Sequence, residues 1–592
     1  MRDRGLLNLR WATALADGLV AAGVNDCVLS PGSRSTPLAL AFLRQPTLRC
    51  HVILDERSAA FFALGIAKAS GRPVLVLCTS GSAAANWFPA VIEADAGATS
   101  LVLLSADRPP ELQGWGANQT IDQTHLFGRH VRTFHQPGAP DVDFSPHYVH
   151  RLAARLVSES RWPLPGPVHL NLALREPLLP SAEAADWPTA TVLTRIPLAT
   201  AGLLPDARLI ADLASTIGGH SGVIICGAAD YPPDFAEAVT ALARQLDCPI
   251  LAEPLSNLRF GAPDRHRLCV RYDTFLRNPS FIAAYAPQWL LRFGAFPVTR
   301  SLQNWLEKAG GATQIIVCPD PRWPDPQHRA RKIVQADPTE VCRALQAANP
   351  PPTAQAWCAA FRQAELAVEA LASTYQAQDS FEGALIPALI ERLPAGHSLF
   401  CGNSMAMRDF DAFSGSSAKK LRIFGNRGAS GIDGNLSTAL GITTDGTCVA
   451  LVGDLTAQHD LTALAAAGGR DLIFIITNNG GGGIFDYLPQ AALPEFERAW
   501  LTPQSLNFAA AAQAFGVAYE EAETLDHFKS ALARALDQGG TTLIEIKTNR
   551  QRSADLHRRY WHSASALSFD TKLATATNIG LGTENGVDVR VG

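Results

Sequence analysis

The sequence lacks several features that would place it among membrane, secreted or nucleic-acid-binding proteins. No uncharged apolar stretch reaches the length of about 18 residues that a spanning helix needs. No long run of lysine or arginine occurs and the net charge is −5, which argues against a nucleic-acid partner. Asp17 and Gly18 interrupt the first apolar segment, so residues 9–22 predict an amphipathic helix and not a signal peptide. We therefore expect neither a membrane nor a nucleic acid as a partner.

Paired cysteine motifs are lacking as well. The eleven cysteines are an odd number, and none belongs to a Cys-x-x-Cys pattern. Several stand within apolar segments typical of buried strands: Cys27, Cys78, Cys226, Cys318, Cys401 and Cys448. Unpaired thiols in apolar strands are typical of proteins kept in a reducing compartment. We therefore predict reduced core thiols in a cytoplasmic protein.

The two common nucleotide-binding signatures are absent. A P-loop requires Gly-Lys followed by Ser or Thr, and a dinucleotide fold opens a helix with Gly-x-Gly-x-x-Gly after its first strand. Neither pattern occurs in this chain. A nucleotide-binding protein that uses the glycine run at 480–483 is therefore a weak alternative.

The sequence does contain enough apolar residues for several cores. Of its 592 residues, 47% are apolar and 18% are charged, and the length alone suggests about four domains. Short apolar runs at 222–227, 289–294 and 314–319 alternate with segments of helical spacing, which is the pattern of a parallel sheet. The same alternation occurs before and after them. We predict an α/β protein with three doubly wound parallel-sheet domains.

Two proline-rich seams suggest where these domains divide. One runs from about 177 to 205, and the other, Asn349–Thr353, is a stiff joint. They predict a first domain over residues 1–180, a central domain over 200–348 and a third domain over 354–569. From 570 to 592 the periodicity is weak, so a loosely docked tail is predicted there.

The most informative segment has two apolar runs that end in polar residues. The first leads into Gly453-Asp454, and the second leads into Asn478-Asn479 and four glycines. One strand–helix–strand crossover fits between them, which would bring Asp454 and Asn478 together at the C-terminal ends of neighbouring strands, where α/β sheets bind ligands. A carboxylate, an amide oxygen and a glycine carbonyl suit Mg²⁺. The alternative is an ordinary crossover with a polar first loop.

A second candidate site lies far upstream. A short apolar run ends in Asp55-Glu56 and is followed by small residues with helical spacing. The next apolar run ends in Thr79-Ser80-Gly81. Taken alone, Glu56 is also explained as an exposed or salt-bridged surface acid.

Three further loops carry distinctive strings. Pro31–Pro37 places Ser33 and Arg34 at a predicted helix N-terminus, which favours anions. Ser105–Leu112, followed by Gly116–Gln119, is the second string, and Gly425–Gly434 is the third.

Together these segments resemble thiamine diphosphate enzymes. The strings at 31–37 and 426–434 resemble, more narrowly, the 2-succinyl-5-enolpyruvyl-6-hydroxy-3-cyclohexene-1-carboxylate (SEPHCHC) synthases of menaquinone and phylloquinone biosynthesis, over about residues 8–550. The resemblance implies that Glu56 is catalytic and faces N1′ of the cofactor, and that Asp454, Asn479 and the Gly481 carbonyl bind Mg²⁺ or Mn²⁺. The cofactor contacts that it implies are Glu56, Thr79, Ser80, Gly81, Ser430, Ile432, Gly453, Asp454, Leu455 and Asn479.

The resemblance also implies the substrates, 2-oxoglutarate and isochorismate. Each carries two carboxylates, which arginine matches with paired hydrogen bonds. The implied substrate residues are the cations Arg34, Arg108, Arg300, Arg408 and Arg427, the polar residues Ser33, Asn118, Gln119 and Ser404, and the apolar residues Ile484, Phe485 and Leu488. Thr299 stands where the family commonly has lysine, which leaves the isochorismate contacts there less well defined.

Assembly and the rival functions follow from the same resemblance. In this superfamily the acidic residue and the diphosphate site come from different chains, so a homodimer or dimer of dimers is expected. Acetolactate synthase, the nearest rival, would not need five arginines in its substrate loops, and its flavin would not fit this short central domain. A non-catalytic paralogue would be marked by loss of Glu56 or Asp454, and both are present.

Overall fold

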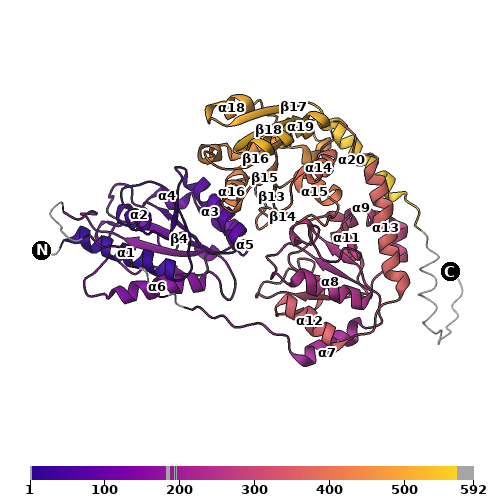
Figure 1. Ribbon diagram of the computed structural model, residues 1–592, viewed down its shortest axis with the longest axis horizontal. Coiled ribbons are helices and arrows are strands. Elements are labelled where there is room, and N and C mark those ends of the chain that lie inside the picture. The colour runs from indigo at the N-terminus through magenta and orange to yellow at the C-terminus, as the bar shows by residue number, and fades with distance from the viewer. Residues whose placement is uncertain (1–2, 182–186, 192–193, 195–196, 380, 570–592) are drawn as a thin grey trace. The chain divides into compact units, whose positions relative to one another are not determined.

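The computed structural model describes residues 3–181, 187–191, 194, 197–379 and 381–569. It contains three six-stranded sheets whose strands are all parallel, with α-helices between most successive strands (Figure 1). The prediction of three doubly wound α/β sheets is confirmed. The tail expected from residue 570 lies outside the described residues.

The first sheet is covered by helices on both faces. Alternate residues of its strands enter different cores, because Val76 packs with α3 and α5 whereas Leu75 packs with α1, α2 and α6. Its strand order is β2-β1-β3-β4-β6-β5. The elements are α1 (Arg4–Ala21), β1 (Asp26–Leu29), α2 (Thr36–Leu43), β2 (Arg49–Val52), α3 (Glu56–Ser70), β3 (Val74–Cys78), α4 (Ser82–Ala85), α5 (Phe88–Ala96), β4 (Leu101–Asp107), β5 (Phe134–His135), α6 (Pro146–Glu159) and β6 (Val168–Ala173).

The second sheet has the order β12-β11-β10-β7-β8-β9, in which the chain starts in the middle and winds outward in both directions. One face packs against α7, α8 and α12, and the other against α9, α10, α11 and α13. The elements are α7 (Ala207–Ile217), β7 (Gly222–Cys226), α8 (Phe235–Leu246), β8 (Ile250–Ala252), β9 (Leu268–Cys269), α9 (Tyr272–Phe275), α10 (Pro279–Ala284), β10 (Trp289–Phe293), α11 (Arg300–Lys308), β11 (Thr313–Val317), β12 (Ala330–Val334), α12 (Pro338–Ala348) and α13 (Gln355–Ser373).

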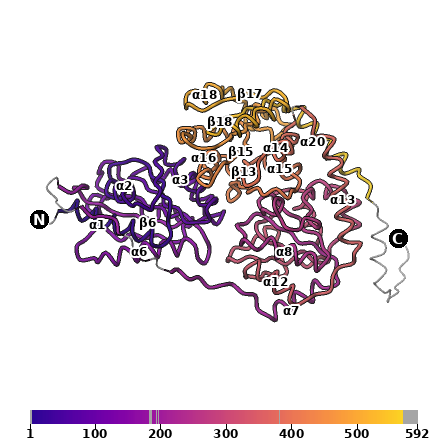
Figure 2. The backbone as a smooth tube through the Cα atoms, viewed as in Figure 1, coloured from indigo at the N-terminus to yellow at the C-terminus, as the bar shows by residue number. Residues whose placement is uncertain are grey.

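The third sheet repeats the winding of the first, in the order β14-β13-β15-β16-β18-β17. Figure 2 shows the backbone of β13, β15 and β18 running through the middle of this layer. The elements are α14 (Glu382–Arg392), β13 (Ser398–Cys401), α15 (Met405–Phe413), β14 (Arg422–Phe424), α16 (Asn435–Ile442), β15 (Cys448–Gly453), α17 (Asp454–His459), β16 (Leu472–Asn478), α18 (Phe508–Ala514), β17 (Ala518–Ala522), α19 (Leu525–Gln538), β18 (Thr541–Lys547) and α20 (Arg550–Ser565).

One hydrophobic core joins the first and third sheets through α3 and α16. The two helices approach so closely that glycine is required on both of them. A Cβ at Gly65 would overlap the Thr438 carbonyl, and a Cβ at Gly441 would overlap the Phe62 carbonyl. This contact brings the helix that begins with Glu56 against the third sheet.

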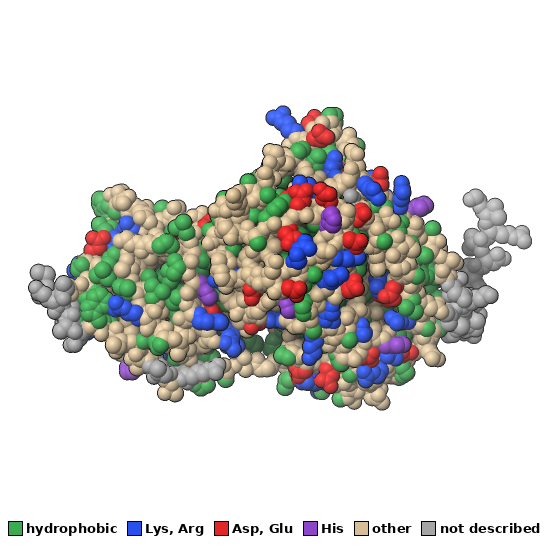
Figure 3. All heavy atoms as spheres, turned by 45° about the horizontal axis from the view of Figure 1, so that its top comes forward, with side chains coloured by type: hydrophobic (Ala, Val, Ile, Leu, Met, Phe, Trp, Pro, Cys, Tyr) green, Lys and Arg blue, Asp and Glu red, His purple; other side chains and the backbone are tan. Residues whose placement is uncertain are grey.

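The chain divides into two compact units, each of which is described on its own. The first unit takes residues 1–201, 392–407 and 422–550, and the second takes 202–391, 408–421 and 551–592. The first unit therefore holds the first and third sheets, and the second unit holds the middle sheet with α13 and most of α20. No helix within the described ranges is long and apolar enough to cross a membrane. On the face shown in Figure 3, acidic and basic side chains are intermingled.

Candidate active site

The first residues of α3 carry the predicted catalytic acid. The Asp55 side chain caps this helix by accepting hydrogen bonds from two backbone N–H groups, one of them that of Arg57 (2.9 Å). The cap fixes Glu56 as the first helical residue, where it is partly exposed. The same end of α3 contacts the third sheet's helices within the first unit, because the Thr462 hydroxyl donates to Asp55 (3.0 Å).

The Thr79–Gly81 turn follows β3 at the C-terminal edge of the first sheet. Its glycine has a φ of +87° and donates its N–H to the Gln123 side chain (2.9 Å). The Arg108 guanidinium donates to the Ser80 hydroxyl, and Gln119 donates to the Ser80 carbonyl (3.0 Å). The structure therefore brings this turn together with two of the predicted substrate residues.

Arg34 is buried beside the same turn. Its backbone N–H donates to the Thr79 hydroxyl (3.3 Å), while its guanidinium donates to the Leu174 carbonyl (2.9 Å) and pairs with Glu176 (2.8 Å). Burial lowers the pKa of Arg108, and the positive charge of Arg34 lowers it further. An anion bound near these two cations would relieve their repulsion. The edge of the first sheet is thus suited to a carboxylate.

Sequence reasoning missed a buried polar network beneath this turn. Gln123 donates to the Asn171 side chain (2.8 Å), and Asn171 donates to Asp107 (2.8 Å), which accepts the N–H of Arg108 (2.7 Å). Burial raises the pKa of Asp107. Gln123 follows the 116–119 string closely, but no pattern in the sequence pairs it with Asn171. The network fixes the backbone from which Arg108 projects.

Three predicted site residues adopt a backbone conformation that only glycine adopts easily. Gln119, Ser404 and Ser430 have φ values of +53°, +68° and +63°. They are three of the ten such residues in the described part of the chain, and this kind of strain concentrates at functional sites. Ser33 and Asn118 are exposed.

The 425–434 loop joins β14 to α16 and is held by Asn403, a residue that sequence reasoning left without a role. The Asn403 side chain donates to the carbonyls of Asn426 (2.9 Å) and Gly431 (2.7 Å), and it accepts a hydrogen bond from Arg427 (2.8 Å). Arg427 is thereby held at the base of the loop. Ile432 is 38% exposed, so it offers an apolar surface to a ligand.

The C-terminal ends of β15 and β16 lie next to each other. Gly453 pairs with Thr477 in parallel register, so Asp454 and Asn478 follow at the same edge. Asp454 is the first residue of α17, is 5% exposed and accepts the N–H of Gly481 (2.7 Å). Burial raises its pKa to about 6. A cation would stabilise such a desolvated carboxylate.

Asn479 offers a second oxygen at this edge. Its Oδ1 atom is buried and has no hydrogen-bond partner among the residues that the structure describes. Asn478, in contrast, donates to a neighbouring carboxylate (2.6 Å) and accepts from Gly480 (3.1 Å). Gly481 has a φ of +143°, and a Cβ there would overlap the Leu501 carbonyl. The desolvated carboxylate, the unpaired amide oxygen and a glycine carbonyl fit Mg²⁺, which prefers hard oxygen ligands.

A short 3₁₀ segment, Gly483–Tyr487, carries two residues of the predicted apolar wall, and the third, Leu488, follows it directly. It is anchored by an ion pair between Asp486 and Arg550. The side chains concerned are half-buried or exposed: Ile484, Phe485 and Leu488.

Two of the five predicted arginines belong to the second unit. Arg300 begins α11 and is exposed, with its guanidinium donating to Gln303 (3.4 Å). Arg408 is exposed on α15. The first unit holds the other three, of which Arg34 and Arg108 share one edge and Arg427 lies on the 425–434 loop.

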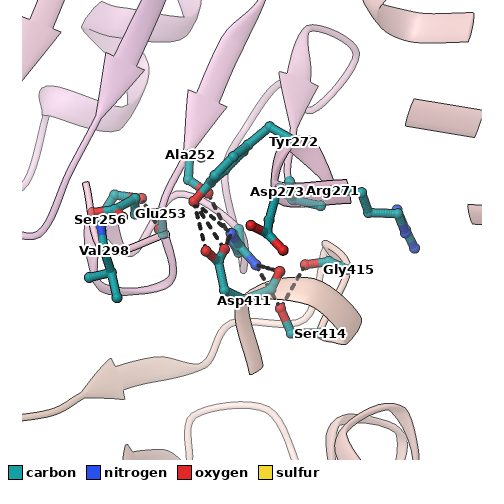
Figure 4. A network of polar contacts seen from close by, with 12 residues as sticks. Ala252, Glu253, Ser256, Arg271, Tyr272, Asp273, Val298, Asp411, Ser414 and Gly415 are labelled. Carbon is teal, nitrogen blue, oxygen red and sulfur yellow. Dashed lines mark hydrogen bonds and ion pairs between the residues drawn. The ribbon is translucent and has the colours of Figure 1, made fainter. Parts of the chain in front are cut away.

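Two buried ion pairs hold α15 close to its exposed arginine. Asp409 pairs with His557 (2.8 Å), and Asp411 pairs with Arg259 and accepts the Tyr272 hydroxyl (3.0 Å). Figure 4 shows Tyr272 and Asp411 facing each other within this network. The position of α15 in the second unit is therefore set by two acids that sequence reasoning did not single out.

Comparison with protein-family models matches all three sheets. The N-terminal TPP (thiamine pyrophosphate, or thiamine diphosphate) binding domain of thiamine pyrophosphate enzymes matches residues 9–126, the middle domain matches 210–401 and the C-terminal TPP binding domain matches 412–546. Benzoylformate decarboxylase from Polynucleobacter necessarius has the same fold, with a TM-score of 0.68 at 18% identity, covering 93% of this chain and 99% of its own.

Curated relatives narrow the family. A protein of Dechloromonas aromatica named 2-succinyl-5-enolpyruvyl-6-hydroxy-3-cyclohexene-1-carboxylate synthase is 48% identical over 92% of this chain and 100% of its own. One of the same name from Geobacillus thermodenitrificans is 43% identical over 94% of this chain and 96% of its own. The chain therefore belongs to the SEPHCHC synthase family of thiamine diphosphate enzymes.

Proposed function

We propose that this protein decarboxylates 2-oxoglutarate and adds the resulting succinyl carbanion equivalent to isochorismate, releasing CO₂ and SEPHCHC for menaquinone or phylloquinone biosynthesis. The observation that carries the proposal is the identity to SEPHCHC synthases over nearly the whole chain. The neighbouring cations Arg34 and Arg108 at the edge of the first sheet add chemical support, because both substrates are dicarboxylates.

Thiamine diphosphate, when bound, would supply the nucleophilic carbon and the electron sink that decarboxylation of a 2-oxo acid needs. Glu56 holds the proton shared with N1′ of the aminopyrimidine ring through a charge-assisted hydrogen bond. Ile432 would pack its exposed apolar side chain against the bound cofactor. Asp454, Asn479 and the Gly481 carbonyl would bind Mg²⁺ or Mn²⁺ beside the diphosphate. The remaining cofactor contacts are Thr79, Ser80, Gly81, Ser430, Gly453 and Leu455.

The predicted arginines divide between the two substrates. Arg408 and Arg427 bind 2-oxoglutarate, whereas Arg34, Arg108 and Arg300 bind isochorismate. Neutral hydrogen bonds come from Ser33, Asn118, Gln119 and Ser404, and the apolar wall consists of Ile484, Phe485 and Leu488.

The active enzyme is a homodimer or a dimer of dimers with sites shared between chains. Exposed apolar side chains beside the catalytic acid support an interface there, since Val52 is 61% and Leu54 79% exposed. We place the enzyme in the cytoplasm, because all eleven cysteines lie in the described residues as free thiols. The domain boundaries that we propose remain 1–180, 200–348 and 354–569.

The test is mass spectrometry of the product formed from 2-oxoglutarate and isochorismate with thiamine diphosphate and Mg²⁺. We expect SEPHCHC and CO₂, with no product when any one component is omitted. Pyruvate offered as the only substrate tests for acetolactate formation. Acetolactate without SEPHCHC would overturn the proposal, and so would the absence of any product from a folded protein that binds the cofactor.

A further inference from the structure

The 425–434 loop presents three proposed site residues, yet its backbone amides are bound by a side chain from α5, a helix that packs on the first sheet. Glu93 of α5 is 3% exposed. One of its oxygens accepts the N–H of Gly428 (2.9 Å), and the other accepts those of Ala429 (2.6 Å) and Ser430 (3.4 Å). Three consecutive amides of the loop therefore converge on one carboxylate.

The start of the loop is bound by a second charged side chain. Lys68 donates to the Gly425 carbonyl (2.7 Å), and its ammonium group lies 3.5 Å from Glu93. The loop packs closely against the C-terminal end of α5, because a Cβ at Gly428 would overlap the backbone of Gly97. The two charges thus engage both a carbonyl and the amides of the same loop.

Lys68 also connects the loop to the helix that carries Glu56. It lies in the last turn of α3, and Glu56 is the first residue of the same helix. A helix is rigid over this distance of about 18 Å, at about 1.5 Å per residue. The helix that carries Glu56 at one end therefore binds the loop that carries Arg427, Ser430 and Ile432 at the other.

We propose that Lys68 and Glu93 are a positioning pair, which holds the 425–434 loop against α3 and α5 and so fixes the orientation of Arg427, Ser430 and Ile432. Neither side chain needs to touch substrate. The inference rests on the proposed function for the roles of the loop residues, but the loop contacts themselves do not depend on it.

The first measurement is hydrogen exchange in the protein without cofactor. In Glu93→Gln, an amide side chain offers one acceptor oxygen in place of two and carries no charge, so all three loop N–H groups lose their charged partner and at least one loses its acceptor. Hydrogen bonds to charged groups contribute about 1.5–3 kcal/mol, which predicts exchange at 428–430 faster by about tenfold or more. Asp95→Asn is the matched control, because Asp95 lies in the same helix and pairs with Arg132 instead.

The second measurement separates alignment from folding. We expect Glu93→Gln to lower kcat/KM for 2-oxoglutarate by about tenfold or more, equivalent to about 1.4 kcal/mol, while the Mg²⁺-dependent affinity for thiamine diphosphate changes less. Lys68→Met should act in the same direction, and the double variant should be no worse than Glu93→Gln. Asp95→Asn should keep the parent values at a comparable melting temperature.

Parent-like exchange at 428–430 in Glu93→Gln would overturn the inference, as would an equal effect of Asp95→Asn. Should Glu93→Gln not fold, Lys68→Met and Glu93→Asp are judged by the same two measurements. A parent protein that makes no SEPHCHC would refute the proposed function alone, because the exchange experiment still decides whether the pair holds the loop.

Discussion

The buried Arg259–Asp411 pair in the second unit allows a quantitative test of what holds α15. The Arg259 side chain is fully buried and donates to the carbonyls of Ala252 (2.8 Å) and Asp411 (2.8 Å), to the Ser414 hydroxyl (3.0 Å) and to the Asp411 carboxylate. The perturbation is Arg259→Met, which keeps an unbranched side chain about as long as the aliphatic part of arginine and removes every donor. It leaves a carboxylate buried without its cation.

The magnitude follows from which energy term dominates. Adding the hydrogen bonds at about 1.5–3 kcal/mol each would overstate the effect, because both ions were removed from water on folding. Removing one partner of a buried pair costs about 3–5 kcal/mol. For a unit of this size, that corresponds to a melting temperature lower by about 6–20 °C.

The pH dependence gives an independent check. Burial raises the pKa of Asp411 to about 6, although Arg259 acts to lower it. Without Arg259 the pKa rises further, so the folded state of the variant binds more protons than the unfolded state over a wider pH range. Its free energy of unfolding therefore falls as pH rises. We expect the variant to lose more stability relative to the parent at pH 8 than at pH 5.5.

The assay is thermal and urea denaturation across this pH range, with hydrogen exchange in α15 to assign the transition. Arg259→Met combined with Asp411→Leu should recover most of the loss, since an apolar pair replaces both charges. A single variant that melts within about 2 °C of the parent, a change worth about 1 kcal/mol or less, would refute the reasoning.

Four further outcomes are expected. Asp454→Ala should abolish Mg²⁺-dependent binding of thiamine diphosphate in calorimetry. Glu56→Gln should still bind the cofactor but lose proton–deuterium exchange at C2 of the cofactor's thiazolium ring. Exchange as fast as in the parent would refute the role assigned to Glu56. Arg427→Ala should lower kcat/KM for 2-oxoglutarate about 30-fold, because a desolvated charge pair is worth about 2–5 kcal/mol, and a change within about twofold contradicts this. His557 is buried, which opposes its charge, but Asp409 outweighs burial and raises its pKa. Its stabilising contribution is complete below the unfolded pKa of about 6.5 and is lost as pH rises through the folded pKa. Urea denaturation should show this loss in the parent and not in Asp409→Asn.

The sequence was sufficient for the elements whose signal is local. The apolar run ending at Val452 became β15, which extends to Gly453, and the run from Leu472 became β16. Between them a helical crossover was expected, but α17 ends at His459 and a 3₁₀ segment, Leu461–Ala466, follows. The buried Asp460 side chain accepts the N–H of Ser437 (2.7 Å) and so binds this segment to α16. A long-range contact of this kind cannot be predicted from the local spacing of apolar residues.

The same limit explains which site residues were found and which were missed. Asp454 and Asn479 stand directly after neighbouring strands, so the parallel register predicts that the two residues lie close together. Glu93 and Lys68 lie within helices that show no motif, and their importance depends on a loop more than three hundred residues away, with sequence separations of 335 and 357. Only the packing of α3 and α5 against the third sheet reveals them.

The glycines at the crossing of α3 and α16 have a consequence for enzyme engineering. Because Gly65 and Gly441 place the backbones of the two helices in direct contact, the spacing there is set by main-chain atoms and not by side-chain rotamers. Side chains elsewhere in this core can be exchanged or repacked without resetting that spacing. Alanine at either glycine, in contrast, would force the two helix backbones apart, because its methyl group would overlap a main-chain carbonyl. The crossing thus provides a means of varying the distance between the two halves of the first unit in a defined step, while every residue at the proposed site stays as it is.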